Sequence, residues 1–217
     1  MTRMCRCLVV FFMLMASTWI PALRAAETSA EAAAMTTAEA AVNTYISNLL
    51  QQMGTIKPLY ETDRKAYFDA VETALVEFVD FNEVARGVMA RYGVGPNGAT
   101  PQQLQRFSEV FRASLVDFYG SALANYGGAE FEIIPMETPP DDPQNATNVR
   151  MIIQADDGNR FEVQYTMFLN QNRVWLLKNL YIEGVNLRRQ YYSQFDSMMT
   201  SHDYDIDKVI DNWQVAK

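Results

Sequence analysis

The sequence predicts an α+β fold, with N-terminal helices packed on an antiparallel β-sheet and further helices at the C-terminal end. Between about residues 37 and 126, apolar residues recur at helical spacing, which is typical of helices that bury one face. Between residues 131 and 182 the period shortens to two, as expected for strands with one buried face. Helices followed by a run of strands favour α+β over a parallel α/β fold.

Start and stop signals divide the N-terminal half into four helices. Thr36 or Thr37 can cap the first helix, and Gly54 is expected to end it. Pro58 lies in a predicted loop before the second helix. Thr100 followed by Pro101 is a strong start signal, because proline is favoured at the first helical position. The predicted helices cover about 37–54, 62–79, 80–92 and 101–126.

The strand region is predicted to be a meander. Apolar residues alternate with polar ones within 131–135, 149–153, 161–169 and 174–182. A hairpin turn is expected over residues 156–159, whose sequence is Asp-Asp-Gly-Asn. Gly184 ends the last strand, and helices are predicted over about 186–199 and 206–213.

Composition limits the class of protein. The chain has 217 residues, of which 49% are hydrophobic, so it can bury the core of one domain. Its net charge of −8 argues against a nucleic-acid partner, which requires a basic surface.

The first residues resemble a secretory signal peptide. Arg3 and Arg6 precede an apolar stretch over 8–20, and small residues follow Pro21. We expect residues 1–25 to be removed, leaving one domain over 36–213; an uncleaved anchor is the alternative. Cys5 and Cys7 would leave with this segment, so we expect no disulfide in the mature chain.

The inventory of reactive residues does not favour an enzyme. The single histidine, His202, lies in a polar, acidic segment, and no nucleophile elbow or phosphate-binding glycine motif is present. The paired aspartates do not have the spacing of a calcium loop, so neither a metal nor a cofactor is predicted.

Two features of the sequence leave alternatives open. Methionine and aromatic residues are prominent on the predicted inner faces, where the pattern favours a filled core but also allows a ligand cavity. Arginines near helix ends either form surface ion pairs or meet a phosphate group. These arginines are Arg86, Arg91, Arg106, Arg112, Arg188 and Arg189.

Three segments together resemble the MlaC, or toluene-tolerance, family, in an order and spacing that cover roughly residues 36–213. One runs from Phe81 through Gly87-Val88-Met89, and another is the run T-P-Q-Q-L-Q-R-F-S-E-V-F that begins at Thr100. The third is similar to the signature W-x-V-Y-D-V-x-V-E-G-V-S-L-V-x-N-Y-R-x-Q-F. Its matches are Trp175, Glu183, Gly184, Val185, Leu187, Tyr191, Gln194 and Phe195. The chain departs from the family pattern at Asn179, where the family has Asp, at Asn186 and at Tyr192.

The resemblance implies a periplasmic carrier that holds a phospholipid by its acyl tails in an apolar cavity between helices and sheet. It also implies two partners, an inner-membrane ABC transporter complex and an outer-membrane lipoprotein–porin complex, and a role in outer-membrane lipid asymmetry. A carrier of another lipid, such as a hopanoid, and a periplasmic adaptor that binds no lipid are the rival hypotheses.

The inward faces of the predicted elements supply the candidate lipid-binding residues. We expect Arg188 and Arg189 to contact a head group or an acidic partner. The candidates for the tail cavity are Val88, Phe111, Leu115, Val149, Met151, Val163, Tyr165, Met167, Trp175 and Leu177.

Overall fold

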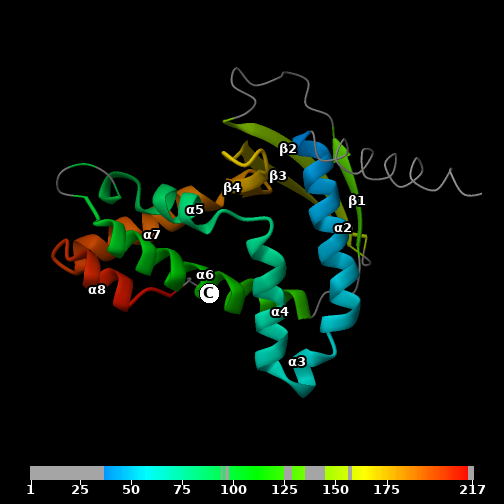
Figure 1. Ribbon diagram of the computed structural model, residues 1–217, viewed down its shortest axis with the longest axis horizontal. Helices are drawn as coiled ribbons and strands as arrows, with labels where there is room; N and C mark the ends of the chain where they lie inside the picture. Colours follow the sequence, from blue (N-terminus) through cyan, green and yellow to red (C-terminus); the bar gives the residue numbers. More distant parts are fainter. Residues whose placement is uncertain are drawn as a thin grey trace, which may run out of the picture.

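The computed structural model describes residues 37–93, 95, 98–124, 129–134, 145–155 and 158–214 (Figure 1). The predicted signal peptide, with Cys5 and Cys7, lies outside these residues. The helices are α2 (Ala38–Ile56), α3 (Leu59–Thr62), α4 (Arg64–Val76), α5 (Phe81–Met89), the 3-10 helix η1 (Ala90–Tyr92), α6 (Pro101–Ala124), α7 (Leu187–Ser201) and α8 (Ile206–Asp211). The strands are β1 (Ala129–Ile134), β2 (Thr147–Ala155), β3 (Arg160–Leu169), β4 (Trp175–Ile182) and β5 (Val185–Asn186). The α+β class is therefore confirmed.

Side-chain caps set the start of most helices. Thr37 accepts a hydrogen bond from the amide of Ala40 and begins α2, as the sequence predicts. Asp63 and Asp80 cap α4 and α5 in the same way. Gly54 does not end α2, which continues to Ile56. Glycine weakens a helix interior without necessarily stopping it.

The strands form one antiparallel sheet in the order β1-β2-β3-β4-β5, which confirms the predicted meander. The predicted turn over residues 156–159 lies partly outside the described residues. Between β4 and β5, Glu183 and Gly184 both have positive φ, as a two-residue primed turn requires, and Ile182 pairs with Val185. Asn186 then caps α7 by accepting from the amide of Arg189.

The free edge of β4 is covered by the segment that joins α4 to α5. The amide of Leu177 donates to the carbonyl of Phe78 at 2.8 Å, and the amide of Asp80 donates to the carbonyl of Leu177 at 3.1 Å. Val79 therefore lies beside Leu177 as a parallel bridge. An uncovered edge invites pairing with another chain, and these bonds protect it.

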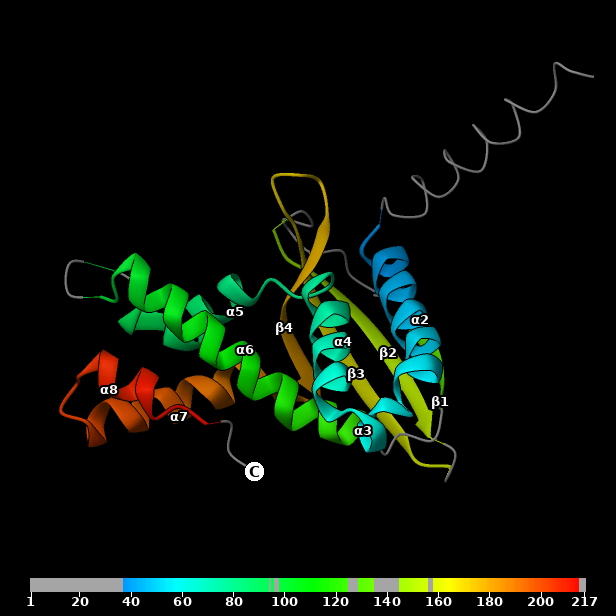
Figure 2. The ribbon, with the colours of Figure 1, turned by 60° about the horizontal axis from the view of Figure 1, so that its bottom comes forward.

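Among the described residues, the core consists of three apolar clusters rather than one. The first, which we call the helical cluster, joins α5, α6, α7 and α8 around Phe107 and Phe195. The second, the sheet cluster, packs α2 on β2, β3 and β4. The third, the hairpin cluster, lies between α2, α4 and α6. Figures 1 and 2 show helices α5, α6, α7 and α8 towards one end of the molecule and the sheet with α2 at the other.

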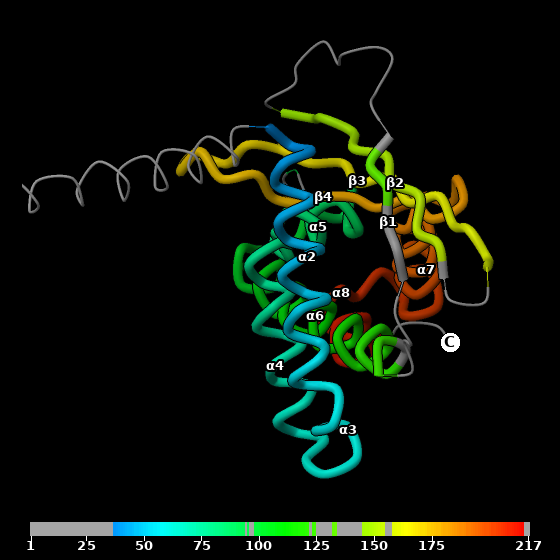
Figure 3. The backbone as a smooth tube through the Cα atoms, turned by 90° about the vertical axis from the view of Figure 1, so that its right-hand side faces the viewer, coloured from blue at the N-terminus to red at the C-terminus, as the bar shows by residue number. Residues whose placement is uncertain are grey.

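Helix α6 extends from the helical cluster to the hairpin cluster. At its far end it approaches α4 closely at Gly120, where an added Cβ would lie 3.0 Å from the ring of Phe68. The hydroxyl of Tyr67 donates to the carbonyl of Gly120 at 2.8 Å across the same contact. Helix α4 also runs beside α2, and α3 joins their ends (Figure 3).

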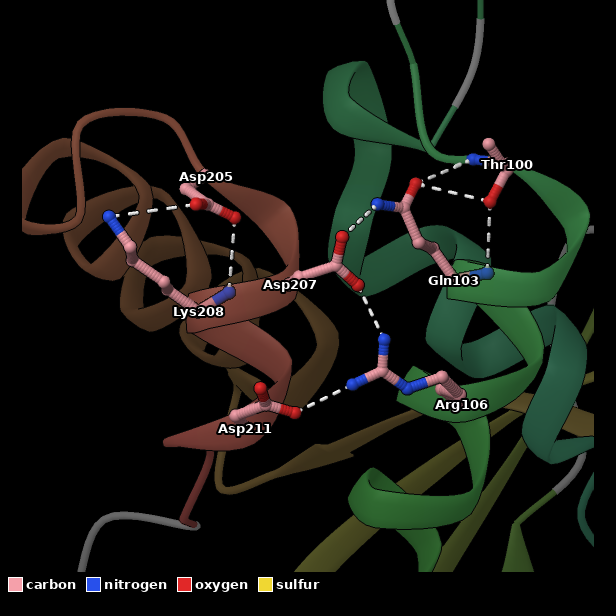
Figure 4. A network of polar contacts seen from close by, with 7 residues as sticks. All are labelled: Thr100, Gln103, Arg106, Asp205, Asp207, Lys208 and Asp211. Carbon is pink, nitrogen blue, oxygen red and sulfur yellow. Dashed lines mark hydrogen bonds and ion pairs between the residues drawn. The ribbon is translucent and has the colours of Figure 1, made fainter.

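A polar network attaches α8 to the start of α6 (Figure 4). Gln103 accepts from the amide of Thr100 and donates to Asp207 at 2.8 Å, so the capping box of α6 is shared with α8. Arg106 bridges Asp207 and Asp211 at 2.5 and 2.6 Å. These contacts close the outer side of the helical cluster.

We expect the helical cluster to carry much of the stability. Phe107 is fully buried and its ring contacts those of Phe111, Phe195 and Trp213, so Phe107→Ala should lower the free energy of unfolding by about 3–5 kcal/mol. Gln102→Ala, at an exposed position of the same helix, should change it by less than about 0.5 kcal/mol. Urea unfolding followed by circular dichroism measures both, and equal values would contradict this view of the core.

Candidate lipid-binding site

An apolar cavity of about 260 Å³ lies where the three clusters meet. Its volume is close to the lower end of the range for small-molecule sites, about 300–1,000 Å³. The walls come from α2, α4, the α4–α5 segment, α5, α6, β3, β4 and α7. The lining residues are Ile46, Leu49, Leu75, Phe78, Val79, Phe81, Val84, Phe111, Leu115, Tyr119, Leu123, Tyr165, Leu177, Asn179, Leu180, Ile182, Leu187, Arg188 and Tyr191.

The structure brings four of the ten predicted tail-binding residues to this wall, namely Phe111, Leu115, Tyr165 and Leu177. Val88 packs in the helical cluster instead, where it is fully buried. The other predicted residues fill the sheet cluster, away from the wall: Val149, Met151, Val163, Met167 and Trp175. Their side chains lie on the inward face of the sheet, as predicted. Because α2 covers this part of the sheet, they pack against a helix rather than beside open space.

A shift of register in β4 adds wall residues that simple alternation misses. Met167 pairs with Leu177, whereas Thr166 pairs with Asn179, so Lys178 is the extra residue of a bulge. Before the bulge the odd-numbered Leu177 faces the cavity, and after it the even-numbered Leu180 and Ile182 also line it. An alternating pattern read from sequence cannot locate such a shift.

Most of the other wall residues without a predicted role lie on the helices. Ile46 and Leu49 belong to the apolar stripe of α2, and Tyr119 and Tyr191 belong to those of α6 and α7. Their helical spacing marks them as inward-facing, but it does not separate a wall residue from a core residue. Asn179 has no such signal, because a single amide within a strand is usually interpreted as a solvent-facing residue.

Three tyrosines lie on the cavity wall, and the structure gives a hydrogen-bond partner to the hydroxyl of each. Tyr119 and Tyr191 share a hydrogen bond at 2.9 Å, and Tyr165 donates weakly to the sulfur of Met151 at 3.8 Å. Burial raises the pKa of Tyr165 above its ordinary value. Burial, together with the hydrogen bond to Tyr119, also raises the pKa of Tyr191. The hydroxyls of Tyr165 and Tyr191 are therefore neutral at physiological pH, which suits an apolar ligand.

The structure separates the six arginines into two groups. Four form ion pairs: Arg86 with Glu83, Arg91 with Asp196, Arg106 with Asp207 and Asp211, and Arg112 with Glu72. Arg188 and Arg189 form none within the described residues. Arg188 lines the cavity, whereas Arg189 is exposed and lies off the wall.

Two further features are absent from the part of the chain that the structure describes. No cluster of histidine, cysteine, aspartate or glutamate suited to a metal ion occurs there. No described helix combines the length and the apolar character needed to cross a membrane.

Comparisons with known proteins agree with this architecture. The family model described as MlaC protein matches residues 43–215. The toluene tolerance protein ttg2D of Pseudomonas putida is 33% identical over 174 residues, which cover 79% of this chain and 78% of that protein. Among solved structures, the phospholipid-binding protein from Ralstonia solanacearum, determined in complex with a phospholipid, superposes with a TM-score of 0.69. That match has 24% identity and covers 81% of this chain and 93% of the other, so it shows a shared fold.

Because Tyr165 and Tyr191 are buried, we expect the free energy of unfolding to fall at alkaline pH. Tyrosines of the unfolded chain ionise near pH ~10, while the raised pKa values keep Tyr165 and Tyr191 protonated in the folded state. Their contribution is therefore complete below pH ~10 and is lost as the pH rises further, because the unfolded state then releases more protons. Urea unfolding at several pH values measures this free energy. It should fall more steeply with pH above ~10 for the parent protein than for Tyr165→Phe. Tyr204→Phe, at an exposed ring, is the matched substitution, and equal slopes for the two variants would contradict the assignment.

Proposed function

The chain belongs to the MlaC family, and we propose that its cavity holds the acyl tails of a phospholipid that it carries through the periplasm. The observation that carries the proposal is the apolar cavity at the junction of the three clusters, in a fold shared with a protein solved in complex with a phospholipid. A cavity at this position is what distinguishes a carrier from an adaptor with a filled core.

The physical need for such a carrier follows from the hydrophobic effect. Each methylene exposed to water costs about 0.8 kcal/mol, and two tails contain about thirty of them, so a lipid does not cross an aqueous compartment unaided. Moving the tails from a bilayer into a cavity of the same polarity is nearly neutral in free energy. The protein therefore needs no chemical step, and direction comes from its partners.

The wider proposal follows the family resemblance. The partners are an inner-membrane ABC transporter complex and an outer-membrane lipoprotein–porin complex, and exchange between them maintains the lipid asymmetry of the outer membrane. Arg189, which is exposed at the start of α7, is available to an acidic surface of either partner.

Identification of the lipid tests the proposal directly. The protein is purified without detergent, extracted with organic solvent and examined by mass spectrometry. A diacyl phospholipid in stoichiometric amount is the expected result. A polycyclic hopanoid would assign the cavity to another lipid class, and an empty protein in gentle native mass spectrometry would favour the adaptor.

Filling the cavity provides a second test. Leu115 lies on the wall, so we expect Leu115→Trp to reduce co-purified phospholipid several-fold by occupying the space of a tail. Leu104→Trp is the matched control, since Leu104 is a partly buried leucine of the same helix that packs against the helical cluster. Thermal unfolding confirms that both variants are folded. Equal lipid content in the two folded variants would remove Leu115 from the site.

A further inference from the structure

Helix α6 runs along the cavity, and its wall residues recur about once per turn. Phe111, Leu115, Tyr119 and Leu123 are each separated by four residues, so they form one stripe on the helix. Phe111 and Leu123 lie twelve positions apart, which corresponds to about 18 Å along the axis of an α-helix. Figure 2 shows α6 running from the neighbourhood of α8 towards α3 and α4. The wall is therefore much longer than one side chain in this direction.

The two ends of the stripe belong to different clusters. At one end, Phe111 and Tyr191 are buried members of the helical cluster, and Val84 and Leu187 pack against it. At the other end, Leu123 packs against the hairpin cluster. The sheet cluster supplies wall residues between them, so the cavity extends from the helical cluster towards the hairpin cluster.

The end of the cavity at Phe111 is closed by aromatic rings. Phe111 is fully buried, whereas the other three residues of the stripe are partly exposed. One turn beyond Phe111 the stripe continues with Phe107, which is also fully buried but is not part of the wall. The ring of Phe111 contacts that of Phe107 at 5.6 Å and that of Trp213 at 5.9 Å. Close-packed rings leave no passage for a tail, so the cavity ends at Phe111.

The length of the stripe is close to that of one acyl tail. The hydrocarbon core of a bilayer is about 30 Å thick and contains two layers of tails, so one tail extends about 15 Å. A methylene group that fits inside the cavity leaves water and should increase the affinity about fourfold. A methylene group for which the cavity has no room gives no such gain. A closed end therefore produces a dependence on tail length.

We propose that Phe111 is the floor of the cavity, against which the end of an acyl tail rests, and that its ring sets the longest tail that the protein can bury completely. The inference rests on the proposed function and adds to it a selectivity for tail length, which does not depend on the head group. Removal of the ring should lengthen the cavity towards Trp213, because Trp213 lies directly behind Phe111.

The first experiment measures affinity as a function of tail length. The probes are lysophosphatidylglycerols with decanoyl, lauroyl, myristoyl, palmitoyl and stearoyl tails, and each displaces a fluorescent fatty acid from the delipidated full chain. The affinity of the parent protein should rise about fourfold with each methylene group and then stop rising, at a tail length that we call the limiting length. We expect this length at or before palmitoyl. A continued rise through stearoyl would overturn the inference.

Phe111→Ala tests the floor, and Phe107→Ala is its matched control. Loss of the Phe111 ring should leave room for about two further methylene groups, because a core site collapses only partly around a deleted side chain. The limiting length should increase accordingly, and stearoyl should gain at least about fourfold relative to palmitoyl. Phe107→Ala deletes the same ring one turn along the stripe, behind the floor and off the wall, so it should leave the limiting length unchanged.

Stability is controlled with a milder pair of variants. Phe111→Leu and Phe107→Leu remove less volume, and they replace the alanine pair if circular dichroism shows that either alanine variant is unfolded; Phe111→Leu should increase the limiting length by about one methylene group. An unchanged limiting length in a folded Phe111 variant would overturn the inference and leave the carrier function intact. An equal increase in the Phe107 variant would place the floor elsewhere and also overturn it. No binding of any probe to the parent protein would instead contradict the carrier function itself.

Discussion

Two backbone hydrogen bonds at Leu177 join the sheet to the helices, and the cavity depends on this junction. They fasten the segment between α4 and α5 to the edge of β4, and the side chains of Phe78, Val79 and Leu177 from both sides of the junction lie on the cavity wall. Asp80, which makes one of the bonds, also caps α5 and so sets the start of the helix that carries Gly87. The same short segment thus closes a strand edge, forms part of the wall and places the helix over which Arg188 lies.

Separate packing of the three clusters explains how an apolar space persists in a close-packed molecule. Each cluster is filled by its own large side chains, and their meeting point is bordered by residues that belong mostly to the margins of the clusters. A single merged core would collapse onto such a space, since open apolar volume lowers stability in proportion to its size. The proposed site for a lipid tail therefore lies between clusters rather than inside one of them.

Hydrophobic period, caps and turn residues were sufficient to predict the fold class and the order of the elements. Thr37 and Asp80 begin helices as expected, and the alternation within β3 and at the start of β4 gives the correct inward faces. The placement of individual residues on the cavity wall was less predictable. Met151 and Leu177 have the same alternating pattern, but Met151 packs in the sheet cluster whereas Leu177 lines open space. Leu180 and Ile182 reach the wall through a bulge that alternation does not reveal.

The sequence alone determined the α+β class, the antiparallel meander and the apolar character of the inner faces, because these follow from local periodicity and turn chemistry. Its motifs also determined the family resemblance, from which Asn179 is a departure. Tertiary structure decided which apolar residues fill the core and which border the cavity, because that choice depends on where separate clusters fail to meet. It also decided which arginines form ion pairs, because the carboxylates beside Arg91, Arg106 and Arg112 come from distant parts of the chain. Arg188, in contrast, lies against Gly87.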